Sequence, residues 1–170
     1  NFRRKHSWRF LSWTTIDMEE LPKRKQHRLA GYDYSKSGYY FVTICTENRI
    51  PLFWKNVGAD IIRPKNNDTD SFLSEYGNFV KESIENISEH YAGVFVDRYC
   101  IMPNHIHVIL FYNENAAGAS PRPTIMDVVC AYKSLTTRRC KEIKPIKKLF
   151  QTSFYDRVIR TEEEYYKIKK

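Results

Sequence analysis

Hydrophobic residues recur along this chain with two periods, one typical of strands and one typical of helices. β-Branched and aromatic residues fill three runs, at 39–46 (YYFVTICT), 93–101 (GVFVDRYCI) and 105–112 (HIHVILFY), and each run predicts a strand. Met-Pro-Asn separates the last two runs, and a short Pro-Asn connection predicts a hairpin turn. The run at 148–159 (KLFQTSFYDRVI) predicts one or two further short extended pieces.

Apolar residues three or four apart predict two amphipathic helices, over 71–91 and 125–143. Capping residues precede both: Asp70 or Ser71 for the first, and Thr124 paired with Asp127 for the second. A third helix should begin at Thr161, which forms a capping box with Glu164. No stop signal precedes Lys170, so we expect the native sequence to continue beyond it.

The order of these elements is strand, helix, strand, strand, helix, short strand, helix. It predicts the α+β class, an antiparallel sheet with helices packed on one face, in a ferredoxin-like arrangement. The length of 170 residues suits one domain. We expect this domain to span 23–170, with its C-terminal helix incomplete, and 1–22 to be an extension of unknown role.

Composition excludes some classes of protein. No apolar run reaches the roughly 18 residues that span a bilayer, so we expect no membrane partner. The start of the chain lacks the apolar segment of a signal peptide. The cysteines show no CxxC spacing and are interpreted as reduced, core-filling thiols of a cytoplasmic protein: Cys45, Cys100, Cys130 and Cys140.

The net charge of +8 is concentrated at the two ends of the chain. Residues 1–30 carry 8 Lys/Arg against 3 Asp/Glu, 31–120 carry 7 against 11, and 121–170 carry 13 against 6. Basic ends favour a polyanion such as nucleic acid as the partner. A solvated basic surface with no partner is the alternative.

Two histidines interrupt the third strand-like run. Side chains alternate along a strand, so His105 and His107 share one face, and Ile106, Val108 and Leu110 share the other. Two imidazoles side by side can be ligands of one metal ion. They can also be ordinary surface or core histidines without a ligand.

Three kinds of metal site are considered. Structural zinc bound by His105, His107 and Cys100 would lack a fourth ligand. A His-x-His-x-His site fails because position 109 is Ile. A divalent cation held by the pair and one oxygen ligand, with open positions for a phosphate, agrees with the basic ends of the chain.

Longer blocks of sequence resemble a known family. The His-hydrophobic-His pair resembles the HUH signature of single-strand DNA nucleases. RLAGYDYSKSGYYFVTICTENR, DRYCIMPNHIHVILF, AYKSLTTRR and SFYDRVIRTEEEYYKI occur in the order found in REP-associated tyrosine transposases. The resemblance covers roughly residues 23–170.

This resemblance implies a metal-dependent endonuclease and strand transferase that acts on single-stranded or hairpin DNA through a 5′-phosphotyrosine. It implies that His105 and His107 hold Mg²⁺ or Mn²⁺. It places the nucleophilic tyrosine at position 171, outside this chain, followed four residues later by Asn or Gln as the third ligand. Tyr166 and Tyr165 are fallback nucleophiles, but their i+4 partners are lysines, so the chain as given should cleave nothing.

Further residues are candidates for DNA contact. Asn104 either contacts phosphate or forms an Asx turn, and Tyr155 and the aromatic residues 39–41 either stack on bases or pack in the core. The basic candidates are Lys133, Arg138, Arg139, Arg157, Arg160, Lys23, Arg24, Lys25 and Arg28. We expect a bacterial, nucleoid-associated protein and leave open a homodimer. The alternative function is a non-catalytic nucleic-acid-binding module with structural or zinc-bound histidines.

Overall fold

A computed structural model describes residues 29, 31–55, 72–116, 123–143 and 145–169. It contains a four-stranded sheet in the order β2-β3-β1-β4. The strands are β1 Gly38–Cys45, β2 Val94–Met102, β3 His105–Tyr112 and β4 Tyr155–Ile159. Every neighbouring pair is antiparallel. This order, with helices after β1 and β3, confirms the predicted ferredoxin-like fold.

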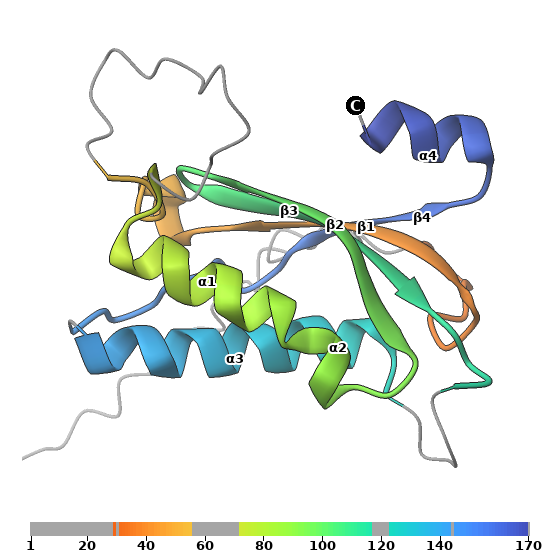
Figure 1. The fold of residues 1–170 in the computed structure, drawn as a ribbon, viewed down its shortest axis with the longest axis horizontal. Coiled ribbons are helices and arrows are strands. Elements are labelled where there is room, and N and C mark those ends of the chain that lie inside the picture. The colour runs from red at the N-terminus through yellow and green to blue at the C-terminus, as the bar shows by residue number, and fades with distance from the viewer. Residues whose placement is uncertain (1–28, 30, 56–71, 117–122, 144, 170) are drawn as a thin grey trace, which may run out of the picture.

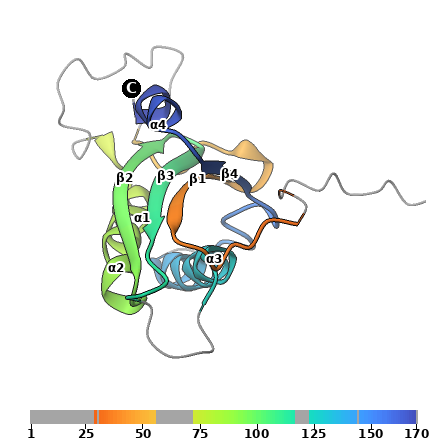
Figure 2. The ribbon, with the colours of Figure 1, turned by 90° about the vertical axis from the view of Figure 1, so that its right-hand side faces the viewer.

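Within the described residues, three α-helices cover one face of the sheet and a fourth α-helix lies on the other (Figures 1 and 2). The covering helices are α1 Glu75–Glu85, α2 Ile87–His90 and α3 Ile125–Ile143. The alternate residues of β1 and β3 that face them are fully or almost fully buried: Tyr40, Val42, Ile44, Ile106, Val108 and Leu110. The opposite face carries α4, Glu162–Lys169. The prediction of helices on one face therefore holds for the core-forming helices, and α4 is a separate feature.

The first helix begins later than the apolar pattern predicted. Ser74 is its N-cap, because the Ser74 Oγ accepts from the backbone N–H of Gly77 at 3.1 Å. The predicted caps Asp70 and Ser71 lie outside the described residues. The predicted single helix is also interrupted at Asn86, which separates α1 from α2. The apolar spacing continues across this break, so the pattern alone could not reveal it.

The two predicted capping boxes differ in detail. At α3, Thr124 and Asp127 bond reciprocally, at 2.9 Å and 3.3 Å, as expected. At α4, the Glu164 backbone N–H donates to the Thr161 Oγ1 at 3.2 Å, but the Glu164 carboxylate accepts from the backbone N–H of Arg160 at 3.0 Å. Glu164 thus ties the start of α4 to the end of β4.

The cysteines are free thiols, as predicted. Only Cys140 is buried in the core, whereas Cys100 and Cys130 are exposed, so the core-filling interpretation was wrong for those two. Within the described part of the chain, no helix combines the length and the apolar character needed to cross a membrane.

Between β1 and the first helix, a one-turn 3-10 helix, η1 Glu47–Arg49, leads the chain away from the sheet. Asn48 and Arg49 both adopt positive φ angles, 53° and 55°. Left-handed backbone at two successive non-glycine residues is strained, and it persists only where the surroundings hold it. This turn lies next to the hairpin that carries the histidines.

Candidate active site

The strand register places the histidine pair on the sheet face that carries α4. His105 lies opposite Cys45 of β1, and His107 lies opposite Thr43. Both imidazoles are half-buried, whereas Ile106 between them is fully buried in the core. The predicted separation of the histidines from the apolar face of β3 is therefore confirmed.

The two rings point their Nε2 atoms at each other. The His105 Nε2 and His107 Nε2 atoms are 3.1 Å apart. Two adjacent ligands of an octahedral ion, each about 2.1 Å from it, lie about 3.0 Å apart. The donor atoms therefore fit two neighbouring coordination positions of one divalent cation. Among the described residues, no group of three His, Cys, Asp or Glu side chains could complete a metal site.

Hydrogen bonds at the Nδ1 atoms set the orientation of both rings. The Asn104 Nδ2 donates to the Arg49 carbonyl oxygen at 3.1 Å, which fixes the amide so that its Oδ1 faces the His105 Nδ1 at 2.7 Å. A carbonyl oxygen can only accept, so the hydrogen of His105 is on Nδ1 and its Nε2 carries a lone pair. The Thr43 hydroxyl lies 2.9 Å from the His107 Nδ1 and can accept or donate there. Such contacts are typical of the residues that support metal-ligating histidines.

The surroundings favour the neutral form of both imidazoles. Burial lowers the pKa of His105, and the nearby Arg49 cation lowers it further. Burial likewise lowers the pKa of His107, with a smaller contribution from His105. Neutral imidazole is the form that binds metal.

The zinc alternative with Cys100 finds no support in the geometry. Cys100 lies opposite His107 in the sheet. Its thiol, however, is 3.7 Å from the Met102 sulfur, and no three-ligand group includes it among the residues described. A closed zinc site needs four ligands. The residues that the structure describes do not bring such a set together.

Two hollows flank the histidine pair on this face. The α4-side hollow, about 290 Å³, lies toward β2 and is lined by Phe41, Val96, Asp97, Arg98, Tyr99, Cys100, His107, Val108, Ile109, Ile168 and Lys169. The β4-side hollow, about 380 Å³, is lined by Thr43, Cys45, Arg49, Gln151, Ser153, Phe154 and Tyr155. The last turn of α4 thus shares a hollow with His107, and the other hollow opens beside it.

Neither fallback nucleophile lies at the histidine pair. The Tyr165 hydroxyl donates to the Asp97 carboxylate at 2.9 Å, and its ring packs on Tyr39 at 5.3 Å. Tyr39 precedes Thr43 by four residues on β1, a separation of about 13 Å along a strand. Tyr165 and Tyr166 line a different hollow, near the end of β4. The contacts of Tyr165 are those of a packing residue, whereas Tyr166 is 58% exposed.

Several predicted DNA-binding cations have partners within the protein. The Lys133 ammonium donates to the carbonyl oxygens of Gln151 and Thr152 at 2.7 and 2.8 Å, and burial lowers its pKa. Arg139 pairs with Glu82 at 2.8 Å. The Lys133 contacts are those of a structural residue that ties α3 to the segment before β4.

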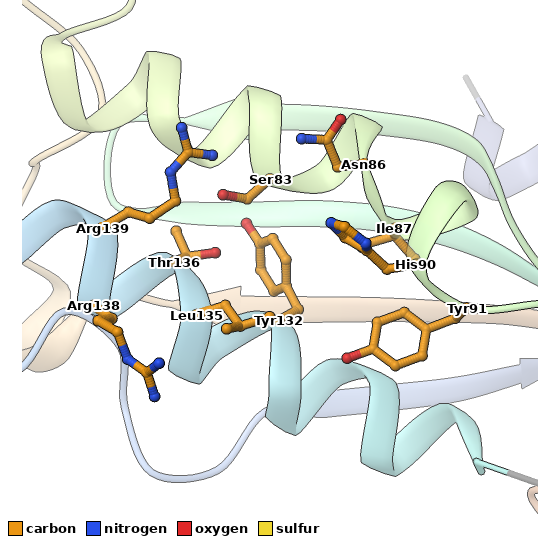
Figure 3. A pocket seen from close by; sticks show the side chains of 10 residues that line it. All are labelled: Ser83, Asn86, Ile87, His90, Tyr91, Tyr132, Leu135, Thr136, Arg138 and Arg139. Atoms are coloured by element: carbon orange, nitrogen blue, oxygen red, sulfur yellow. The ribbon is translucent and has the colours of Figure 1, made fainter.

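Arg138 and Arg139 also lie on the helix-covered side of the sheet, away from the histidines. They border a separate hollow of about 200 Å³ between α1, α2 and α3, into which Tyr132 projects (Figure 3). Toward the histidine face, Arg157 pairs with Glu164 at 2.5 Å, and Arg160 lines the hollow near the end of β4. The predicted arm of Lys23, Arg24, Lys25 and Arg28 lies outside the described residues.

The aromatic residues that were candidates for base stacking lie partly in the core and partly at the candidate site. Tyr40 is fully buried, as the packing alternative predicted. Phe41 stacks on the His107 ring at 5.2 Å, and Tyr155 is 48% exposed at the β4-side hollow. Asn104 orients His105 through its side chain, and its contact with phosphate stays a prediction.

Two residues at this site were missed in the sequence. Alternation along β1 places Thr43 on the sheet face that carries α4. Only the strand register shows that Thr43 lies opposite His107. Arg49 carries no sequence signal, because its position depends on the left-handed turn that follows β1.

Comparisons with known proteins extend this description. No protein-family model matches the chain. A Haemophilus influenzae protein described only as uncharacterized is 31% identical over 160 residues, covering 85% of this chain and 83% of that protein. A second protein from H. influenzae, named "Putative REP-associated tyrosine transposase", is 23% identical over 138 residues, which are 78% of this chain and 66% of that protein.

Among solved structures, a REP-associated tyrosine transposase bound to a REP hairpin matches with a TM-score of 0.51 at 16% identity. The match covers 83% of this chain and 67% of that one. At this level of identity the likeness establishes a shared fold.

Proposed function

Because this chain is similar in sequence to a protein named "Putative REP-associated tyrosine transposase" and shares the fold of a solved REP-associated tyrosine transposase, we propose that it is a metal-dependent nuclease and strand transferase for single-stranded DNA. Its proposed substrate is DNA that forms a hairpin, since the related structure was solved with a REP hairpin. The observation that carries the proposal is the histidine pair, whose Nε2 atoms are 3.1 Å apart on the face that carries α4.

His105 and His107 would hold Mg²⁺ or Mn²⁺ through their Nε2 atoms. When bound, the cation supplies Lewis-acid polarisation of the scissile phosphate oxygens. Asn104 fixes the tautomer in which the His105 Nε2 carries a lone pair, and the Thr43 hydroxyl can accept the Nδ1 hydrogen of His107 when the His107 Nε2 binds the cation. The third ligand in this proposal is the Asn or Gln that follows the nucleophile by four residues, on the same helix face.

The nucleophile in this proposal is a tyrosine at position 171. Ile168 lines the α4-side hollow together with His107. Residues i and i+3 share a helix face, so a helix continued to position 171 would present that side chain toward the same hollow. The phenolic oxygen forms a bond to phosphorus as the bond from phosphorus to the 3′-oxygen breaks. The phenol loses its proton, the 3′-oxygen gains one, and the retained ester allows the reverse step to rejoin strands.

The test is formation of a covalent protein–DNA adduct. Full-length protein is incubated with a hairpin oligonucleotide that has single-stranded flanks, in the presence of Mn²⁺, and separated on a denaturing gel. We expect an adduct with the wild type and none with His105→Ala. The matched control is His90→Ala, because His90 is exposed on α2, on the helix-covered side of the sheet. A protein that ends at Lys170 should form no adduct.

A separate measurement of Mn²⁺ binding by titration calorimetry tests the metal site without activity. His105→Ala should abolish binding, and His90→Ala should not change it. If no hairpin yields an adduct, or if the adduct survives His105→Ala, the nuclease proposal fails and a non-catalytic nucleic-acid-binding module takes its place.

A further inference from the structure

The β4-side hollow exists because two neighbouring segments are unequal in length. Tyr155 pairs with Thr43 at the start of β4, and the Gln151 backbone N–H donates to the Cys45 carbonyl oxygen at 2.9 Å. Between these two points, β1 advances by two residues and the facing segment by four. The residues 152–154 therefore bow away from β1. The resulting space, about 380 Å³, is within the size range of small-molecule sites.

The lining of this hollow suits a nucleotide. Its described lining residues include one cation, Arg49, and no carboxylate, and Ser153 and Gln151 add neutral hydrogen-bonding groups. Tyr155 contributes an aromatic ring that is 48% exposed. A guanidinium binds phosphate oxygens, and an exposed ring stacks on a base of any sequence.

The position of Arg49 is coupled to the histidine pair. The strained turn that carries it, with φ angles of 53° at Asn48 and 55° at Arg49, is fixed by the bond from the Asn104 amide to the Arg49 carbonyl oxygen. The same amide orients His105. One side chain therefore positions both the histidine and the cation beside the hollow, and strained backbone of this kind is typical of functional sites.

We propose that the β4-side hollow binds the nucleotide that carries the departing 3′-oxygen, with Arg49 at its phosphate and Tyr155 stacked on its base. This inference rests on the proposed function. The last turn of α4 lines the hollow on the opposite side of His107, so the phenol approaches phosphorus from that side. In an in-line displacement the attacking and leaving oxygens lie on opposite sides of phosphorus. The 3′-oxygen therefore departs toward the β4-side hollow.

The first test measures binding without cleavage. Fluorescence anisotropy follows a short single-stranded oligonucleotide with a free 3′-OH as it binds to full-length protein. Loss of one stacked base weakens binding roughly 5- to 150-fold, so we expect this range for Tyr155→Leu and little change for Tyr155→Phe. Arg49→Gln should weaken binding and reduce its salt dependence, and Arg49→Lys should restore both in part. Lys141→Ala removes an exposed cation from α3 and serves as the charge control. Thermal melts establish that the variants fold.

The second test locates the nucleotide. Once the cut position has been mapped from the adduct, 5-iododeoxyuridine is placed on either its 5′ or its 3′ side. Irradiation should cross-link Tyr155 to the 5′ nucleotide, which bears the leaving oxygen. A cross-link from the 3′ nucleotide instead, or equal binding by Tyr155→Leu and wild type, would overturn the assignment of this hollow.

The two proposals can fail separately. An adduct with wild-type protein, combined with unchanged oligonucleotide binding by Tyr155→Leu, refutes the role of the hollow and leaves the nuclease intact. Absence of any adduct, combined with weakened binding by Tyr155→Leu, refutes the nuclease and retains the hollow as a nucleotide site.

Discussion

Thr43→Val should weaken metal binding without disturbing the fold. Valine has nearly the shape of threonine and is equally suited to a strand, but it lacks the Oγ1 atom that lies 2.9 Å from the His107 Nδ1. When the His107 Nε2 binds a cation, the ring hydrogen must be on Nδ1. In the metal-free protein that hydrogen can instead be on Nε2, donated to the His105 Nε2 at 3.1 Å. The substitution therefore destabilises the cation-bound form more than the metal-free form.

The magnitude follows from the cost of one unsatisfied donor. A half-buried N–H without an acceptor costs about 1–2 kcal/mol. The Kd for Mn²⁺ should therefore rise about 5- to 30-fold, which overlaps the range of roughly 10- to 100-fold found when a supporting contact of a metal ligand is removed. The free energy of unfolding of the metal-free protein should fall by less than about 1 kcal/mol.

The assay is titration of full-length protein with MnCl₂ by calorimetry near neutral pH, together with urea denaturation of the metal-free form. Thr43→Ser retains a hydroxyl on the same carbon and is the matched control, so its Kd should stay near that of the wild type. His107→Ala removes the metal ligand itself and should abolish Mn²⁺ binding. If Thr43→Val binds Mn²⁺ as tightly as wild type while His107→Ala does not, the Nδ1 contact has no role in orienting the ligand.

Three further predictions concern stability and pH. Lys133→Met leaves two backbone carbonyls without their donor and should lower the free energy of unfolding by about 2 kcal/mol in urea denaturation. An unchanged urea midpoint would show that Lys133 is not structural. Gly77→Ala places a Cβ against the Phe53 carbonyl oxygen, so it should destabilise by at least about 2 kcal/mol despite the helix preference of alanine, and a more stable variant would refute this. Because burial lowers the pKa of His105 and His107, Mn²⁺ affinity should hold down to about pH 6.5 and fall at lower pH, and calorimetric loss of binding already above pH 7 would contradict this.

The elements of this fold could be predicted from the sequence because their signals are local. Alternation of side chains is enough to place His105 and His107 on one face of a strand and Ile106 on the other. The cap at Thr124 likewise involves residues three positions apart. The start of α1 was misjudged because apolar spacing continues past its true N-cap, Ser74.

Only the tertiary structure decided which groups surround the histidines. Thr43 meets His107 across 64 positions of sequence, through a strand register that no local pattern specifies. Arg49 reaches the site through a left-handed turn. The Lys133 ammonium donates to backbone carbonyl oxygens, although its sequence context is that of a surface cation. The sequence alone determined the elements, the buried face and the paired imidazoles, because local periodicity and capping encode them. The partners of a polar side chain depend on how distant strands and loops pack, and packing is a property of the whole chain.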